Sequence, residues 1–85
     1  MNEVVLVIAD WCPICPRAKS LWRNIRKEYD FDYKEVDISS KEGSDLVAKH
    51  SIRSVPTTII DGSVAFIGVP DRDGAVEAIT NSGGE

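Results

Sequence analysis

Residues 4–15 of this 85-residue chain read Val-Val-Leu-Val-Ile-Ala-Asp-Trp-Cys-Pro-Ile-Cys, and this stretch decides the fold. Its leading apolar residues, many of them β-branched, predict a strand over Val4–Ala9 that is buried on both faces. Behind it, apolar side chains recur at spacings of three and four, which predicts an amphipathic helix. These residues are Cys15, Ala18, Trp22, Ile25 and Tyr29. We expect the helix to start at Cys12 as its N-cap, with Pro13 at the first helical position and a distorted turn at Pro16.

Five further elements are predicted along the rest of the chain. They are a strand over Phe31–Asp37, a short helix over Asp45–His50 capped by Ser40 or Ser44, strands over Thr57–Ile60 and Val64–Ile67, and a final helix that begins at Asp71 or Asp73. The first strand, helix and second strand form a βαβ unit with parallel strands. The dipeptide Asp61-Gly62 predicts a hairpin between the last two strands, because both central residues of that turn need positive φ. The fold class is therefore α/β: one domain over residues 1–85, in the order β-α-β-α-β-β-α, with a four-stranded mixed sheet and three helices on its two faces.

Charge is unevenly spread along the chain. The net charge is −4, yet every charged residue between Trp11 and Lys27 is basic. The overall acidity argues against nucleic-acid binding. No apolar run approaches the roughly 20 residues that a membrane-spanning helix needs. The first residues also lack the basic start of a secretory signal peptide, so we expect a cytoplasmic protein that binds neither membrane nor nucleic acid.

The two cysteines, Cys12 and Cys15, are separated by only two residues. A bond between them closes almost no chain and would stabilise the fold little, so chemistry explains the pair better than stapling. A thiol exchanges with disulfides as a thiolate, which the helix N-terminus and the cations Arg17 and Lys19 should favour at Cys12. We expect Cys12 to attack a substrate disulfide and Cys15, buried and less acidic, to release the reduced substrate.

Metal binding is the main alternative for the paired cysteines. A structural zinc site needs about four ligands, and only His50 adds a nitrogen to the two sulfurs of Cys12 and Cys15. A Cys-x-x-Cys motif that opens a helix after a strand, inside a βαβ unit, is typical of redox proteins. We therefore expect no resident metal and no intrinsic cofactor besides the redox-active Cys12–Cys15 disulfide.

Three stretches of the chain resemble the thioredoxin superfamily. They are Trp11-Cys12-Pro13-Ile14-Cys15 after the first strand, Ser54-Val55-Pro56-Thr57 before the third strand, and Phe66-Ile67-Gly68 before the last helix. The resemblance implies a thioredoxin-like fold with a cis bond before Pro56, which lies beside the cysteines. It also implies that the Val55 main chain pairs with an extended substrate as an added strand does, while Gly68 leaves room for it. Substrate contacts are expected at Trp11, Pro13, Ile14, Val55, Pro56 and Gly68.

Features of two branches of that superfamily occur together. Cys-Pro-Ile-Cys is similar to the glutaredoxin motif Cys-Pro-Tyr-Cys, and Thr57 and Asp71 match positions that hold glutathione in glutaredoxins. Trp11 is thioredoxin-like, and it either contributes to an apolar contact surface or is a partly buried boundary residue. The buried acid of the thioredoxin central strand has no counterpart within Val4–Ala9. Overall, the chain resembles the short glutaredoxin-like thioredoxins of archaea and bacteria, which are similar to NrdH-type redoxins.

Three functions follow from these patterns. The favoured one is a thiol–disulfide oxidoreductase that acts as a cytoplasmic monomer, reduces protein disulfides and takes electrons from a flavin-dependent thioredoxin reductase. In this function Arg17 would favour the Cys12 thiolate. The second is a glutathione-dependent glutaredoxin, in which Thr57 and Asp71 would contact glutathione. The third is a non-catalytic module that keeps Cys12 and Cys15 to hold a metal.

Overall fold

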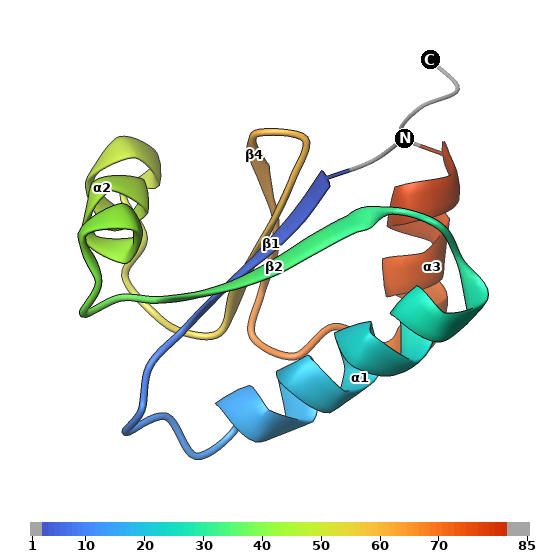
Figure 1. Cartoon of the computed structure of the whole chain (residues 1–85), viewed down its shortest axis with the longest axis horizontal. Helices are drawn as coiled ribbons and strands as arrows, with labels where there is room; N and C mark the ends of the chain where they lie inside the picture. The colour runs from blue at the N-terminus through green and yellow to red at the C-terminus, as the bar shows by residue number, and fades with distance from the viewer. Residues whose placement is uncertain (1–2, 82–85) are drawn as a thin grey trace.

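The structure, a computed structural model, describes residues 3–81 of the chain (Figure 1). The strands and helices are β1 Glu3–Ile8, α1 Cys15–Glu28, β2 Asp32–Asp37, α2 Lys41–His50, β3 Thr57–Ile60, β4 Ser63–Ile67 and α3 Arg72–Asn81. This order is the predicted order β-α-β-α-β-β-α. None of the helices within residues 3–81 combines the length and the apolar character that crossing a membrane requires.

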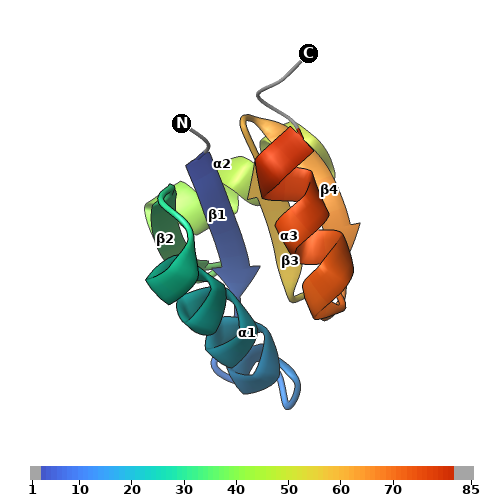
Figure 2. The ribbon, with the colours of Figure 1, turned by 90° about the vertical axis from the view of Figure 1, so that its right-hand side faces the viewer.

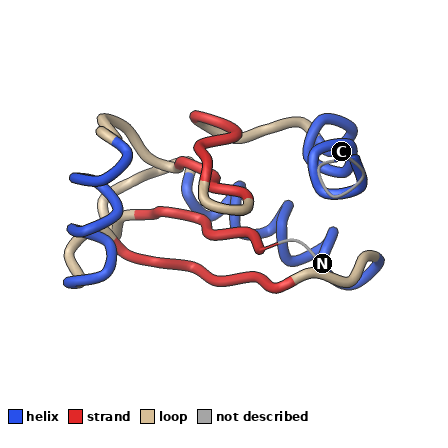
Figure 3. Tube along the Cα trace, turned by 90° about the horizontal axis from the view of Figure 1, so that it is seen from above, coloured by secondary structure: helices blue, strands red, loops and turns tan. Residues whose placement is uncertain are grey.

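The strands form one mixed sheet in the order β2-β1-β3-β4. β1 pairs parallel with β2 and antiparallel with β3, and β4 pairs antiparallel with β3. α1 and α3 cover one face of the sheet, and α2 lies behind the other (Figure 2). Seen from above, the strands lie between α2 and α3 (Figure 3). The prediction of a four-stranded mixed sheet with helices on both faces is confirmed.

The pairing of β1 with β3 brings two distant loops together. Because these strands are antiparallel, Val7 near the end of β1 lies opposite Thr57 at the start of β3. The segment that follows β1 carries Cys12, and the segment that precedes β3 carries Val55 and Pro56. The sheet therefore places both segments at its edge where β1 ends, a common position for sites in α/β proteins.

A buried layer between the sheet and α1 anchors that helix. Trp22 and Phe31 are 0% and 1% exposed, and their rings meet edge to face with centroids 6.0 Å apart. The Trp22 indole N–H donates a hydrogen bond of 3.2 Å to the hydroxyl of Thr58, which is also fully buried. This bond joins the helix that begins at Cys15 to the strand that follows Pro56.

The start of α1 differs from the prediction. The helix spans Cys15–Glu28, with Ile14 at its N-cap, so Cys12 is not the N-cap and Pro13 precedes the helix. Pro16 instead lies in the first turn, where N–H groups have no helical partner and its missing N–H breaks no bond. The distortion that we expected at Pro16 is therefore avoided, and the helix is continuous.

The second helix is longer than predicted, because it begins at Lys41 rather than Asp45. Ser40 is its N-cap, and the Ser40 hydroxyl accepts a hydrogen bond of 3.0 Å from the N–H of Gly43. A Cβ at Gly43 would lie 2.0 Å from the carbonyl oxygen of Asp37. Glycine here lets α2 approach the end of β2, which explains why a poor helix former occupies the first turn.

The turn between β3 and β4 has the predicted geometry. Asp61 and Gly62 both have positive φ, at 52° and 86°. The last helix follows Asp71 rather than Asp73, and the Asp71 carbonyl accepts a hydrogen bond of 3.0 Å from the Ala75 N–H.

Candidate active site

Cys12 lies against the loop that precedes β3. Its main-chain N–H donates to the Ala9 carbonyl at 3.2 Å, and its thiol donates to the Val55 carbonyl at 3.6 Å. The Val55–Pro56 peptide bond is cis, as the resemblance implied. The N–H of Gly68, a residue with φ of 91°, donates to the Pro56 carbonyl at 2.7 Å. These bonds join three segments that are far apart in the sequence, and the sulfur of Cys12 contacts the segment that carries Val55.

The two thiols have different surroundings. Cys12 is 5% exposed and Cys15 is 1% exposed. Burial and a hydrogen bond with Cys12 raise the pKa of Cys15 to about 11, although a hydrogen bond with the Ala9 main chain and the charge of Lys19 oppose this. At neutral pH Cys15 is therefore a protonated thiol behind Cys12, as the sequence predicts.

Exposed apolar side chains surround Cys12. Trp11 is 72% exposed and Ile14 is 39% exposed, and Pro13 between the cysteines is exposed as well. The alternative that Trp11 is a partly buried boundary residue is therefore wrong. Trp11 also borders a hollow of about 140 Å³, which lies beside the loop that contacts Cys12. Its other lining residues are Ile38, Val47, Ile52, Arg53, Ser54 and Val55. Apolar surface of this kind favours contact with another polypeptide.

The site has the groups that thiol–disulfide exchange requires. Both cysteines are free thiols, and their side chains lie within hydrogen-bonding reach of each other. One sulfur can form a mixed disulfide with a substrate, and the other can then displace that substrate. Within residues 3–81, no cluster of three or more His, Cys, Asp or Glu side chains is arranged to hold a metal ion. His50 borders a different hollow, together with Val64 and Ile67.

The sequence profile of the thioredoxin domain matches residues 3–80 of the chain. The chain belongs to the thioredoxin family. It is 36% identical over 78 residues to a thioredoxin of Methanocaldococcus jannaschii, covering 91% of each chain. It is 31% identical over 72 residues to a probable thioredoxin of Archaeoglobus fulgidus, covering 85% of this chain and 79% of that one. A solved thioredoxin from Fasciola hepatica superposes with a TM-score of 0.76 and 27% identity, over 94% of this chain and 79% of the other.

As a member of the thioredoxin family, the protein is a thiol–disulfide oxidoreductase. This chemistry needs a redox-active cysteine pair and no further cofactor, and Cys12 and Cys15 are the only cysteines of the chain. The similar proteins are named thioredoxins rather than glutaredoxins. These similarities confirm the thioredoxin superfamily that the motifs indicated. They do not show that the chain belongs to its glutaredoxin-like branch.

The two basic residues that follow the motif lie in different surroundings. Arg17 is exposed, and its effect on Cys12 stays a prediction. Lys19 is half-buried, and its charge acts on Cys15. The signal for this pairing was present in the sequence, because residues four apart on a helix lie on the same side. We had instead expected this charge to favour the thiolate of Cys12.

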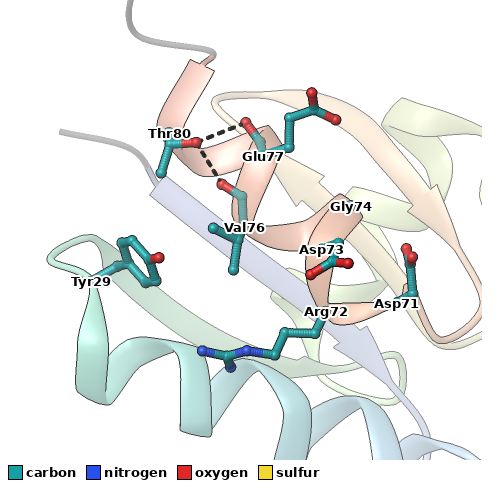
Figure 4. A pocket seen from close by; sticks show the side chains of 8 residues that line it. All are labelled: Tyr29, Asp71, Arg72, Asp73, Gly74, Val76, Glu77 and Thr80. Carbon is teal, nitrogen blue, oxygen red and sulfur yellow. Dashed lines mark hydrogen bonds between the residues drawn. The ribbon is translucent and has the colours of Figure 1, made fainter.

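The two residues proposed to contact glutathione lie in different surroundings. Thr57 is 2% exposed, and its hydroxyl donates to the Ser54 carbonyl at 2.7 Å, so it is not presented to a ligand. Asp71 is exposed and borders a groove between α3 and the end of α1, together with Tyr29 and Arg72 (Figure 4). The structure therefore gives no observation in favour of a glutathione site built from Thr57 and Asp71.

Proposed function

We propose that this member of the thioredoxin family reduces disulfide bonds of protein substrates in the cytoplasm. It would act as a monomer that receives electrons from a flavin-dependent, thioredoxin reductase-like enzyme. The observation that carries the proposal is the position of the Cys12 thiol, which contacts the Val55 carbonyl while Cys15 is buried behind it. The similarity to the thioredoxin of Methanocaldococcus jannaschii, which covers 91% of both chains, supports the same activity.

The reaction proceeds in two exchange steps. The Cys12 thiolate attacks one sulfur of a substrate disulfide, and the other substrate sulfur leaves as a thiolate that takes up a proton. Cys15 then loses its proton and attacks the Cys12 sulfur, which releases the second substrate sulfur. A Cys12–Cys15 disulfide forms while the substrate gains two electrons and two protons. The donor enzyme returns two electrons to the pair.

Substrate recognition uses main-chain pairing and the apolar rim. An extended segment that pairs with Val55 would place its own cysteine beside the Cys12 sulfur, because the Val55 carbonyl already contacts that sulfur. Trp11, Pro13 and Ile14 would contact the substrate side chains on either side of the disulfide. Gly68 leaves room for the substrate chain, since nothing lies within 4 Å of the place where a Cβ would stand.

Trapping a mixed disulfide tests the roles of the two cysteines. The Cys15→Ser variant should accumulate a covalent complex with a disulfide-bonded protein substrate, because the attack by Cys12 is intact and release is blocked. The Cys12→Ser variant serves as the matched control, since it retains one thiol but should form no such complex. A complex that accumulates with Cys12→Ser and is absent with Cys15→Ser would reverse the assigned roles.

The electron donor is tested by the reduction potential of the Cys12–Cys15 pair. A value near that of thioredoxin, about −270 mV, supports reduction of protein disulfides by a reductase-coupled protein. A value of about −200 to −230 mV is typical of glutaredoxins and would favour glutathione as donor. Reduction of the oxidised protein by glutathione alone, at millimolar concentration, would contradict the proposed donor.

A further inference from the structure

An ion pair shows how α1 lies against β2. Nε and Nη2 of Arg23 donate to the two carboxylate oxygens of Glu35 at 2.8 and 2.7 Å, and the Tyr33 hydroxyl donates to the same carboxylate at 2.7 Å. The side chain of Glu35 therefore faces α1. Side chains alternate along a strand, so Asp37, two residues further on, faces the same side.

Along this contact, one turn of α1 covers about the same length as two residues of β2. α1 runs antiparallel to β2, because it returns from the end of β1 to the start of the parallel strand β2. Four helical residues advance about 6 Å and two strand residues about 7 Å. One turn back from Arg23 lies Lys19, which is therefore opposite Asp37, and one turn further back lies Cys15. The row Arg23, Lys19 and Cys15 leads from the ion pair to the buried thiol.

The charge of Lys19 acts on two carboxylates of β2 and on one thiol of α1. Lys19 is half-buried, and it interacts electrostatically with Asp37 and Glu35 of β2 and with Cys15 of its own helix. The other ionisable group that acts on Cys15 is Cys12. The segment Val4–Ala9, which leads to the motif, contributes none, since it contains no ionisable side chain. Lys19, one helical turn after Cys15, is thus the cation whose charge acts on the second thiol.

The two carboxylates opposite Lys19 are kept ionised by other partners. The hydroxyl and the N–H of Ser39 donate to Asp37 at 2.6 and 2.8 Å, and these bonds lower the pKa of Asp37, which Asp10 also contacts. Burial opposes ionisation of Glu35, but the hydrogen bonds from Arg23 and the neighbouring tyrosine outweigh it and lower the pKa of Glu35. Both groups are anions at neutral pH, and they attract the ammonium group of Lys19 toward the contact between α1 and β2.

We propose that Lys19 stabilises the thiolate of Cys15 during substrate release and thereby speeds that step at neutral pH. This inference rests on the proposed roles of Cys12 and Cys15. Cys15 loses its proton to water, and the negative charge on its sulfur is balanced by the Lys19 ammonium. That sulfur bonds to the Cys12 sulfur, the bond from Cys12 to the substrate breaks, and the substrate leaves as a thiolate that takes up a proton.

The attack by Cys12 and the displacement by Cys15 can be followed separately when the reduced protein reacts with dithiobis(nitrobenzoate). The reagent is added at one molecule per protein. Attack by Cys12 releases one coloured thionitrobenzoate anion, and displacement by Cys15 releases the second, so the second phase is followed across a range of pH. Lys19→Met removes the charge and keeps an apolar stem, whereas Lys19→Arg retains the charge. Lys27→Met is the matched control, because Lys27 is exposed at the other end of the same helix.

We expect Lys19→Met to slow the second phase about threefold at neutral pH and to shift its pH profile upward by about half a unit, with the first phase unchanged. Lys19→Arg should restore the rate, and Lys27→Met should match the wild type. Three results would overturn the proposal: an unchanged second phase in Lys19→Met, an equal slowing in Lys19→Arg, or an equal slowing in Lys27→Met. A wild-type protein that releases no second anion would refute the proposed function itself, and this inference with it.

Discussion

Replacing Trp22 with phenylalanine tests how firmly the helix that carries Cys15 is anchored to the sheet. Trp22 and Thr58 are both 0% exposed, and the indole N–H donates to the Thr58 hydroxyl at 3.2 Å. In Trp22→Phe the hydroxyl has no partner and no access to water. The matched variant Thr58→Val removes the hydroxyl with little change of shape and leaves the indole N–H unpaired instead.

The expected fall in the free energy of unfolding of Trp22→Phe is the sum of two costs. An unpaired buried polar group costs about 1–3 kcal/mol, and the cavity left by the smaller ring costs about 1 kcal/mol more. The free energy of unfolding should therefore fall by about 2–4 kcal/mol, a large part of the total for a domain of this size. Thr58→Val alone should lower it by about 1–2 kcal/mol. In the double variant no polar group is left unpaired, so its loss should be smaller than the sum of the single losses by about 1 kcal/mol.

Urea unfolding followed by far-ultraviolet circular dichroism measures all four proteins without relying on tryptophan fluorescence. Free energies are compared at a common slope, because a change in slope would indicate an altered unfolded or native state. Losses that add to within about 0.3 kcal/mol would show that Trp22 and Thr58 do not interact energetically. In that case packing alone would anchor α1, and the reasoning from the buried hydrogen bond would be refuted.

Three further predictions concern the elements around the site. Gly43→Ala should lower the free energy of unfolding by about 2 kcal/mol or more, because the added Cβ would collide with the Asp37 carbonyl. Thermal melts measure the loss, and a variant as stable as the wild type would show that α2 moves away at little cost. Gly68→Ala should lower the free energy of unfolding by only about 1 kcal/mol, because a side chain is strained at a φ of 91° but has open space around it. A loss as large as that of Gly43→Ala would contradict this expectation. Glu35→Gln should flatten the acid side of the stability–pH curve. The pKa of Glu35 is lowered in the folded protein, so its carboxylate stabilises the fold above its ordinary pKa of 4.5, and this stabilisation is lost as the pH falls further. An acid limb that is unchanged by Glu35→Gln would refute the contribution of the pair with Arg23.

The elements of the fold could be predicted from the sequence because their signals are local. The apolar run Val4–Ala9 and the spacing of three and four behind it indicate a strand and a helix through periodicity alone. Asp61-Gly62 specifies a turn because few other residues adopt positive φ at both positions. The pair Cys12 and Cys15 is also a local signal. Two thiols separated by two residues lie close enough to form a disulfide with each other, and this is what the redox chemistry requires.

The ends of helices were predicted less well, because several residues compete for them. Pro13 and Pro16 both suit a first turn, and the choice of Pro16 depends on how the chain leaves β1, where the Cys12 N–H bonds to the Ala9 carbonyl. Ser40 was preferred to Ser44 because Gly43 allows α2 to approach the Asp37 carbonyl, a contact that no local pattern contains.

The sequence by itself thus determined which strands and helices form and which two sulfurs carry the chemistry. The tertiary structure decided what surrounds those sulfurs. The contact of Cys12 with Val55 follows from the antiparallel pairing of β1 with β3, and the burial of Thr57 follows from its place in the same pairing. The position of Lys19 near Cys15 and Asp37 depends on how α1 lies on β2. These relations join residues that are far apart along the chain, and periodicity carries no information about which of them the folded sheet brings together.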